Sequence, residues 1–206
     1  REEFLRLNPF HWGFEFYEIF DLDKPKEKRG FDVVIGNPPY VRQEALGELK
    51  TYFKDQYKVY SGTADLYVYF IERSLSSLNN DGIFSYIVAN KWMRANYGTP
   101  LRQWLKRQCI EEIVDFGDLP VFQATTYPCI IRISKNPPKS NFDVTEVETL
   151  SFASLNEYVK EHKFAVSQKG LDDSGLSLVD EKTQALLTKL RQVGVPLGDY
   201  VNGKIY

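Results

Sequence analysis

The feature that most constrains this chain is a short apolar run that ends in a proline-rich corner. Residues 31–35, Phe-Asp-Val-Val-Ile, have the β-branched centre typical of a parallel strand covered on both faces. Gly36 then permits close backbone approach or an unusual dihedral, whereas Pro38 and Pro39 fix two φ angles and remove two N–H donors. The sequence therefore predicts a rigid loop at the carboxyl end of a strand, where open α/β sheets bind their ligands.

The polar and aromatic groups of this corner suit a planar ligand that carries an amine. Asn37 offers a side-chain acceptor, the Pro38 carbonyl offers a second acceptor in a fixed direction, and Tyr40 offers a flat aromatic face. A Pro-Pro corner by itself is more often a tight turn with a buried Asn and a packed Tyr. A binding role is favoured here because the corner follows directly on a predicted strand.

The string Asn37-Pro38-Pro39-Tyr40 resembles the catalytic motif of amino-group methyltransferases that use S-adenosylmethionine, particularly the adenine-N6 DNA methyltransferases of restriction-modification systems. Later stretches resemble further elements of that family in the same order, and together the resemblance covers residues 9–135. These stretches are residues 65–73, 80–82, 90–92, 101–105, 121–122 and 128–131.

The resemblance implies a fold and a set of catalytic residues. The expected fold is α/β, a partial Rossmann-like class I methyltransferase sheet that is mostly parallel and has an antiparallel final strand. Asn37 and the Pro38 carbonyl would each accept one N6 hydrogen of an adenine flipped out of double-stranded DNA, and Tyr40 would stack on its ring. The expected reaction is methyl transfer from S-adenosylmethionine to that nitrogen, without a metal.

Three further site residues follow from the resemblance alone. Phe122 stands where the family places a second aromatic against the flipped base, and Pro39 and Phe70 stand where it places the cofactor's adenine. The residues themselves leave alternatives open. Phe122 also fits a turn residue that pins a strand pair, and Phe70 also fits a core aromatic on the apolar stripe of a helix.

The chain resembles only part of such an enzyme. Relatives hold S-adenosylmethionine mainly through a Gly-rich loop that precedes the catalytic motif, and this chain has no Gly-rich loop after a predicted strand. We expect residues 1–135 to be a partial catalytic domain whose main cofactor loop lies upstream, so that the fragment alone is inactive. Residues 136–206 are expected to be a C-terminal extension leading toward a target-recognition domain. The recognised DNA sequence is therefore not predicted from this chain.

Composition bears on the partner and the compartment. The 206 residues carry a net charge of −2, whereas DNA-binding surfaces are usually basic. Local basic surfaces are the expected explanation, and solvated faces are the alternative. The candidate cations are Lys50, Lys54 and Lys58 at helical spacing, and Lys91, Arg94, Arg102, Lys106 and Arg107 after the second predicted strand. With neither a membrane-length apolar run nor a leader, the cytoplasm is the expected compartment.

Periodicity and turn residues predict the order of elements. A second parallel strand is expected over 83–88, which places Asn90, Lys91 and Trp92 at the same sheet edge as Asn37. A third strand over 110–116 and a fourth over 127–134 should be antiparallel to each other, and a further strand is expected over 142–150. Helices are expected over 44–57, from an N-cap at 63 to a stop at 79–82, and over 101–109, 154–162 and 180–193.

Other functions share the same corner. A glutamine-N5 methyltransferase that acts on protein and a guanine-N2 methyltransferase that acts on RNA have similar acceptors and a similar stacking ring. A non-catalytic DNA-binding fragment is a third alternative. The long segment between Tyr40 and Thr63 and the extension after Lys135 favour DNA as the substrate, with a fused or partner endonuclease as a further possibility.

Overall fold

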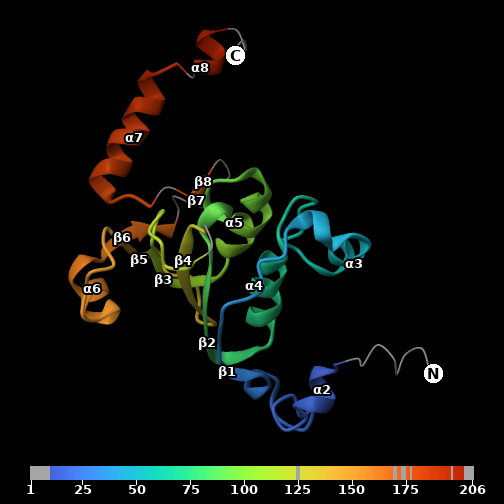
Figure 1. The fold of residues 1–206 in the computed structure, drawn as a ribbon. Helices are drawn as coiled ribbons and strands as arrows, with labels where there is room; N and C mark the ends of the chain where they lie inside the picture. Colours follow the sequence, from blue (N-terminus) through green and yellow to red (C-terminus); the bar gives the residue numbers. More distant parts are fainter. Residues whose placement is uncertain are drawn as a thin grey trace.

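The body of the molecule is a six-stranded sheet with the strand order β1-β2-β4-β3-β5-β6 (Figure 1). The structure is a computed structural model and describes residues 10–123, 126–168, 171–172, 175–176, 178–195 and 197–201. The strands of the sheet are β1 (Phe31–Gly36), β2 (Leu78–Ala89), β3 (Cys109–Asp115), β4 (Pro128–Ser134), β5 (Asn141–Glu146) and β6 (Phe164–Ser167). A separate hairpin pairs β7 (Leu171–Asp172) with β8 (Gly175–Leu176).

Strand direction places several chain segments at one edge of this sheet. β1 pairs in parallel with β2, and β3 pairs in parallel with β5, whereas β4 runs antiparallel to both β2 and β3. β1, β2, β3 and β5 therefore end on the same side, which we call the carboxyl edge. The segments that follow Gly36, Ala89 and Asp115 lie there, together with Tyr127, which precedes β4. This confirms the predicted α/β class, with mostly parallel strands and an antiparallel fourth strand.

Helices cover the two faces of the sheet unequally. The helices are α2 (Trp12–Glu15), α3 (Leu49–Gln56), α4 (Leu66–Ser76), α5 (Thr99–Leu105), α6 (Leu155–His162), α7 (Glu181–Val193) and α8 (Leu197–Tyr200). Apolar residues of α4 and α5 form the main core with one face, and α6 packs on the opposite face through Val159, against Val114 and Val147 (Figure 1). None of the helices in the described part of the chain has the length and apolar character needed to cross a membrane.

Two predicted helices differ from the observed ones at their ends. The helix expected over 44–57 is divided into a 3-10 turn, η2 (Gln43–Leu46), and α3, because Gly47 between them adopts a φ of +46°. The next helix, α4, begins after Asp65 rather than after Thr63. It ends at Ser76, and the predicted stop residues 79–82 already belong to β2.

The prediction that β1 is covered on both faces is wrong for this chain. Val33 and Ile35 are 59% and 79% exposed, and Ile83, which lies beside Val33 in β2, is exposed too. β1 is the outermost strand of the sheet, and the face that carries these side chains is not covered by a helix among the described residues. The apolar run of the strand therefore reflects burial on one face only within this chain.

The aromatic segment before β1 packs as a cluster at the base of the sheet. Trp12, Phe16 and Phe20 surround the ring of Phe31, with ring centres 5.1 to 5.9 Å away. The interplanar angles are 78° to 84°, so the rings meet edge to face. This segment contains the short helix α2 and no strand among its described residues.

The C-terminal helices begin as predicted. Ser154 caps α6 and Asp180 caps α7, each accepting a hydrogen bond from a backbone N–H three residues later. α7 extends away from the sheet in Figure 1 and exposes Leu186, Leu190 and Val193. The sheet continues beyond residue 135 through β5 and β6. The division into residues 1–135 and 136–206 stays a prediction.

Candidate active site

The proline corner after β1 passes very close to β2. A Cβ atom at Gly36 would lie 3.1 Å from the Cε1 atom of the Tyr86 ring, so a glycine allows the approach. Tyr86 is held in turn, because its hydroxyl and that of Ser74 on α4 are 2.6 Å apart. Close approach, rather than an unusual dihedral, is therefore the role of Gly36.

The other end of the corner is fixed to the start of α4. The Val41 carbonyl accepts a hydrogen bond from the Leu66 N–H at 3.0 Å, and the Gln43 N–H donates to Oδ1 of Asp65 at 3.1 Å. Residues 37–40 are thus held between β1 and α4, with two prolines that limit their backbone freedom. The predicted rigidity of the corner has a structural basis at both ends.

Asn37 projects from this corner with its hydrogen-bonding capacity unused. Its side chain is exposed and makes no hydrogen bond to any residue that the structure describes. Pro38 beside it is buried, whereas the Pro39 ring is exposed. The amide oxygen of Asn37 is therefore available to a ligand, which is the opposite of the buried Asn expected for a purely structural turn.

Tyr40 is packed on one side and open on another. It is 38% exposed, its hydroxyl donates a long hydrogen bond of 3.5 Å to the Ile87 carbonyl, and its ring centre lies 6.2 Å from that of Tyr67. Partial burial raises the pKa of Tyr40, so the phenol stays neutral at physiological pH. Tyr67 is fully buried, and its hydroxyl pairs with that of Tyr97 at 3.0 Å. The sequence analysis did not predict this support from Tyr67.

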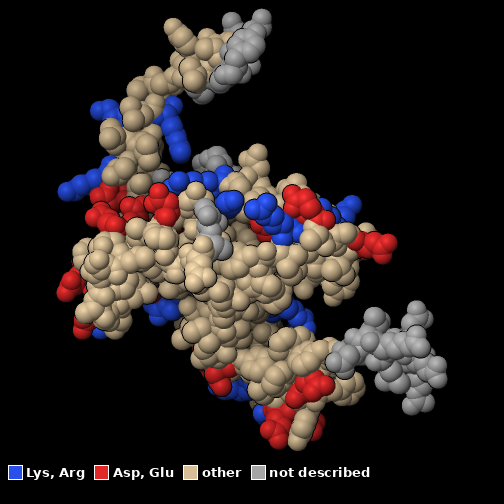
Figure 2. Space-filling model, viewed as in Figure 1, with Lys and Arg blue, Asp and Glu red and all other residues tan. Residues whose placement is uncertain are grey.

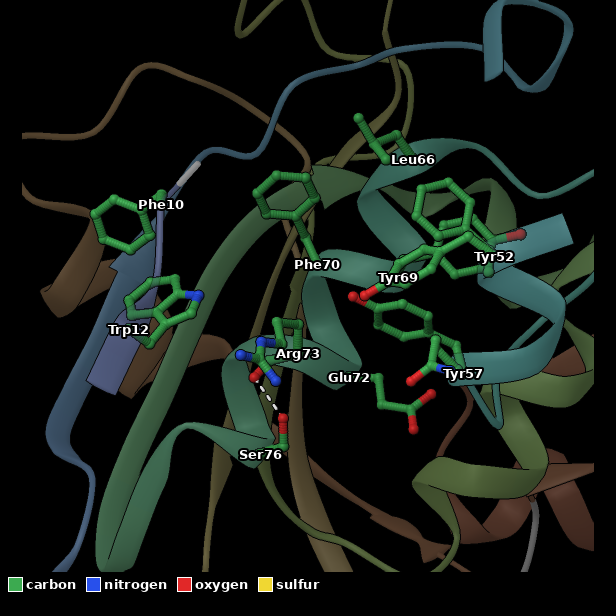
Figure 3. Close-up of a pocket in the computed structure, with 12 residues that line it drawn as sticks. Phe10, Trp12, Tyr52, Tyr57, Leu66, Tyr69, Phe70, Glu72, Arg73 and Ser76 are labelled. Carbon is green, nitrogen blue, oxygen red and sulfur yellow. Dashed lines mark hydrogen bonds between the residues drawn. The ribbon is translucent and has the colours of Figure 1, made fainter. Parts of the chain in front are cut away.

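Phe70 faces a hollow and not the main core. Its neighbours on α4, Tyr69 and Ile71, are buried, whereas Phe70 is 37% exposed. The hollow has a volume of about 590 Å³ and lies between α4, α3 and the N-terminal segment (Figure 3). In Figure 3 the Phe70 ring points into it, between Phe10 and Tyr69. A residue that only filled the core would not be placed in this way.

Phe122 lies in the loop that joins β3 to β4, and its side chain is half-buried. The base of this loop is closed at the carboxyl edge, because the Phe116 N–H donates to the Pro128 carbonyl at 3.1 Å. β2 and β4 separate β3 from β1, which amounts to three strand spacings of about 4.8 Å each. Phe122 could therefore contact a base held at Asn37 only if its loop extends across the ends of the intervening strands.

The basic residues predicted after β2 do not form one surface. Arg102 is buried, and its guanidinium donates to the carbonyls of Trp92 and Ala95 at 2.6 and 2.9 Å. Arg107 lies between α5 and the start of β3, at the sheet edge opposite to Asn37. Lys91 and Arg94 alone among these residues lie at the carboxyl edge with exposed side chains. Counting Arg102 as a surface cation was therefore wrong.

Comparisons with known proteins show the family of this chain. Residues 2–122 match the family model described as Eco57I restriction-modification methylase. The chain belongs to this family. It is 40% identical over 109 residues to the type II methyltransferase M.PaeR7I of Pseudomonas aeruginosa, an alignment that covers 51% of this chain and 19% of that relative. It is 29% identical over 180 residues to the type II restriction enzyme and methyltransferase RM.Eco57I of Escherichia coli, covering 83% of this chain and 18% of that relative.

The chain thus spans about a fifth of the length of these relatives. Among solved structures, the methyltransferase subunit of a type I restriction-modification system from Streptococcus thermophilus superposes with a TM-score of 0.57 at 14% sequence identity. That superposition covers 77% of this chain and 39% of the other. At this level of identity the likeness supports the fold, which is that of the class I methyltransferase sheet.

Proposed function

We propose that the protein containing this chain transfers a methyl group from S-adenosylmethionine to N6 of an adenine in a specific DNA sequence. Membership of a restriction-modification methylase family supports methylation of DNA. The observation that carries the choice of an amine is the corner itself, where the amide of Asn37 is exposed and uncommitted beside the half-open ring of Tyr40. A restriction-modification system is the expected setting, because the relatives' names describe such systems.

The proposed role of Asn37 and Pro38 is to change the electronic state of the target nitrogen. An exocyclic adenine amine is a poor nucleophile, because its lone pair is delocalised into the ring. Two acceptors, the Asn37 amide oxygen and the Pro38 carbonyl, would bind the two N6 hydrogens and favour a tetrahedral nitrogen whose lone pair points outward. That lone pair would form the new N–C bond as the S–CH3 bond of the sulfonium breaks, with the electron pair of that bond staying on sulfur and a neutral thioether leaving. The acceptors would stabilise the positive charge that develops on nitrogen, and the surplus proton would pass to water.

Tyr40 would hold the ring of the same base. A paired adenine must leave the duplex before its amine can react, at a cost of a few kcal/mol. Stacking on one aromatic ring returns about 1–3 kcal/mol. Since Tyr67 backs the ring of Tyr40 and the Tyr40 hydroxyl contacts the Ile87 carbonyl, little further ordering is required when a base stacks on it. Phe122 is proposed as the second wall, brought in by its loop.

The residues present fit one end of the cofactor. S-adenosylmethionine, when bound, supplies an electrophilic methyl group on a sulfonium. The exposed rings of Pro39 and Phe70 offer flat apolar surfaces of the kind that an adenine moiety packs on, and Phe70 points into a hollow large enough for such a group (Figure 3). We therefore propose Pro39 and Phe70 as cofactor contacts. Pro39 is two residues after Asn37 in the same corner, so a cofactor packed on its ring would lie close to Asn37.

The proposal is tested by removing the Asn37 amide from the intact protein. Asn37→Ala should lower methyl incorporation from labelled S-adenosylmethionine into amplified, unmethylated bacterial DNA by about 10²- to 10³-fold, the usual effect of removing one preorganised polar group from a transition state. Asn80→Ala is the matched control, because Asn80 is an exposed asparagine near the opposite sheet edge.

The product identifies the target atom. Digestion of the methylated DNA to nucleosides, followed by mass spectrometry, should give N6-methyladenosine in its deoxy form. A different methylated nucleoside would refute the adenine assignment. An Asn37→Ala protein with wild-type activity would refute the role of the corner.

A second activity is expected to accompany methylation in the intact protein or in a partner. RM.Eco57I is named a restriction enzyme and methyltransferase, and this chain aligns with it over 83% of its length. Because the alignment with this relative covers 83% of the present chain, we propose that an endonuclease is fused to the intact protein or acts as its partner. Cleavage of unmethylated DNA by the intact protein, with protection after incubation with S-adenosylmethionine, is the expected behaviour.

A further inference from the structure

A second hollow lies at the carboxyl edge, next to the proline corner but separate from it. Its volume is about 500 Å³, and its walls include Asn90, Lys91, Arg94, Asp115, Asp118 and Tyr127. Asn90 follows β2, the strand that pairs directly with β1, whereas Asp115 and Asp118 lie at and after the end of β3, so the hollow extends from one to three strands away from Asn37. Neither the catalytic corner nor the hollow around Phe70 shares any of these residues.

Two cations face this hollow, and one of them, Arg94, interacts electrostatically with Glu146 at the end of β5. Within the described residues, neither Lys91 nor Arg94 makes a side-chain hydrogen bond or an ion pair. They are three residues apart in and just after a 3-10 turn, η3 (Asn90–Met93), where side chains at that spacing eclipse each other. Both side chains are exposed. The turn therefore presents two positive charges on one side.

The backbone that carries these cations is held from beneath by Arg102. The guanidinium of the buried Arg102 donates hydrogen bonds to the carbonyls of Trp92 and Ala95, at 2.6 and 2.9 Å. Gly98 closes the same loop, since a Cβ there would overlap the Trp92 carbonyl oxygen and approach Nη1 of Arg102 to 2.8 Å. A loop organised by a buried charge holds Lys91 and Arg94 in place before any ligand arrives, which reduces the entropy lost on binding.

The opposite wall carries two carboxylates with different roles. Oδ1 of Asp115 accepts hydrogen bonds from the Asn90 amide at 2.9 Å and from the Gly117 N–H at 3.1 Å, so this carboxylate serves to fix the wall. Asp118 is exposed. Its negative charge opposes the positive field of Lys91 and Arg94, so removing that charge would increase the affinity of the hollow for an anion.

We propose that this hollow binds a backbone phosphate of the DNA strand that carries the target base, with Lys91 and Arg94 as its ligands. The inference rests on the proposed function. A flipped nucleotide stays attached to its strand through its phosphates, so cations one strand away from Asn37 are placed to meet them. Figure 2 shows Lys and Arg side chains (blue) along the upper rim of the molecule, flanked by acidic side chains (red). The basic surface is local, as a net charge of −2 requires.

The test measures how DNA binding by the intact protein depends on salt. Fluorescence anisotropy with a short labelled duplex of random sequence gives Kd between about 50 and 200 mM salt, and backbone contacts need no recognition site. Lys91→Ala and Arg94→Ala should each reduce the slope of log K against log salt by about 0.9. Arg107→Ala, which removes an exposed cation at the opposite edge, should leave the slope unchanged.

Asp118→Asn supplies a test of opposite sign. It should tighten DNA binding, because it removes the negative charge that faces the phosphate. Equal slopes for the Lys91, Arg94 and Arg107 variants, or weaker binding by Asp118→Asn, would overturn the phosphate site. Failure here is distinct from failure of the proposed function. A wild-type protein that methylates no DNA refutes the function, whereas active Lys91 and Arg94 variants with unchanged slopes refute only this site.

Discussion

At the scale of single residues, the proposed chemistry depends on side chains whose backbone is fixed and whose hydrogen-bonding or stacking surface is still available to a ligand. Asn37 is exposed and unbonded within the described residues, and the backbone on both sides of it is fixed by β1 and by α4. Tyr40 shows the same combination, because Tyr67 supports one part of its ring and another part is open. Such preorganisation lowers the cost of binding a planar ligand.

The stacking role of Tyr40 can be separated from its hydroxyl. Tyr40→Ala removes a stacking surface worth about 1–3 kcal/mol, which corresponds to a loss of about 5- to 150-fold in kcat/KM for methylation of DNA. Tyr40→Phe keeps the ring and removes only a hydrogen bond of 3.5 Å, so its kcat/KM should stay close to that of the wild type. Steady-state kinetics of the intact protein measure both.

Tyr17→Ala serves as the control for this pair, since Tyr17 is an exposed tyrosine in the N-terminal segment. A Tyr40→Ala protein as active as Tyr17→Ala would contradict the stacking role. A Tyr40→Phe protein as impaired as Tyr40→Ala would show instead that the hydroxyl is essential.

The site residues differ in how far the sequence reveals them. The NPPY string following an apolar run is enough to predict an exposed polar group at a strand's end, and Asn37 has that position. The buried role of Arg102 is not visible in the sequence, because arginines are mostly exposed and its acceptors are carbonyls seven and ten residues away. Tyr67 and Phe70 both belong to a helix rich in aromatic residues. Only the packing shows that Tyr67 lies against Tyr40 of the corner and that Phe70 faces a hollow.

At the scale of elements, the loop from Asn90 to Gly98 is a compact unit held by hydrogen bonds to one guanidinium. Its two 3-10 turns, η3 and η4 (Asn96–Gly98), run directly into α5. The Trp92 carbonyl lies close enough to residue 98 that no side chain fits there. Stability of this element is therefore sensitive to a single added methyl group.

Gly98→Ala should destabilise the protein by about 1–3 kcal/mol, the usual cost of overpacking a tight site. Thermal unfolding followed by circular dichroism gives the change as a lower Tm. Gly62→Ala is the control, because the nearest atom to its added Cβ would be the Tyr60 hydroxyl at 3.7 Å. A Tm for Gly98→Ala equal to that of the control would mean that the loop can move aside.

Caps and breakers account for which element boundaries could be predicted. Ser154 and Asp180 begin α6 and α7 as expected, since short polar side chains that satisfy the first N–H groups are strong local signals. The break between η2 and α3 depends on the positive φ of Gly47. It could not be predicted from the sequence, because a single glycine within a helical pattern is also compatible with an unbroken helix. The end of α4 was predicted too late, because residues 79–82 have the composition of a turn but belong to the first part of β2.

At the scale of the whole molecule, the exposed edge strand β1 bears on whether the chain associates with other copies of itself in solution. β1 is an edge strand, and an apolar face runs from Val33 and Ile35 onto Ile83 of β2. The sequence could not show this exposure, because the same apolar run suits a strand covered on both faces. What decides the difference is which neighbouring elements are present.

The 206-residue chain by itself should associate through this surface, since long apolar edge strands pair readily with other chains. Ile35→Lys places a charge on the exposed face and should shift the chain toward monomer. Thr51→Lys, on the exposed side of α3, adds the same charge elsewhere and should not. Sedimentation velocity distinguishes the species, and a wild-type chain that is monomeric at high concentration would contradict the expectation.

The loop that carries Phe122 is anchored apart from the proline corner. Its two ends are joined at the adjacent strands β3 and β4 by the hydrogen bond between the Phe116 N–H and the Pro128 carbonyl, whereas Asn37 follows β1, the strand at the edge of the sheet. A change of sequence in this loop leaves intact the hydrogen bonds that hold residues 37–40 between β1 and α4. Under the proposed function, substitutions in this loop are therefore expected to alter which substrates are accepted and to leave the acceptors of Asn37 and Pro38 in place.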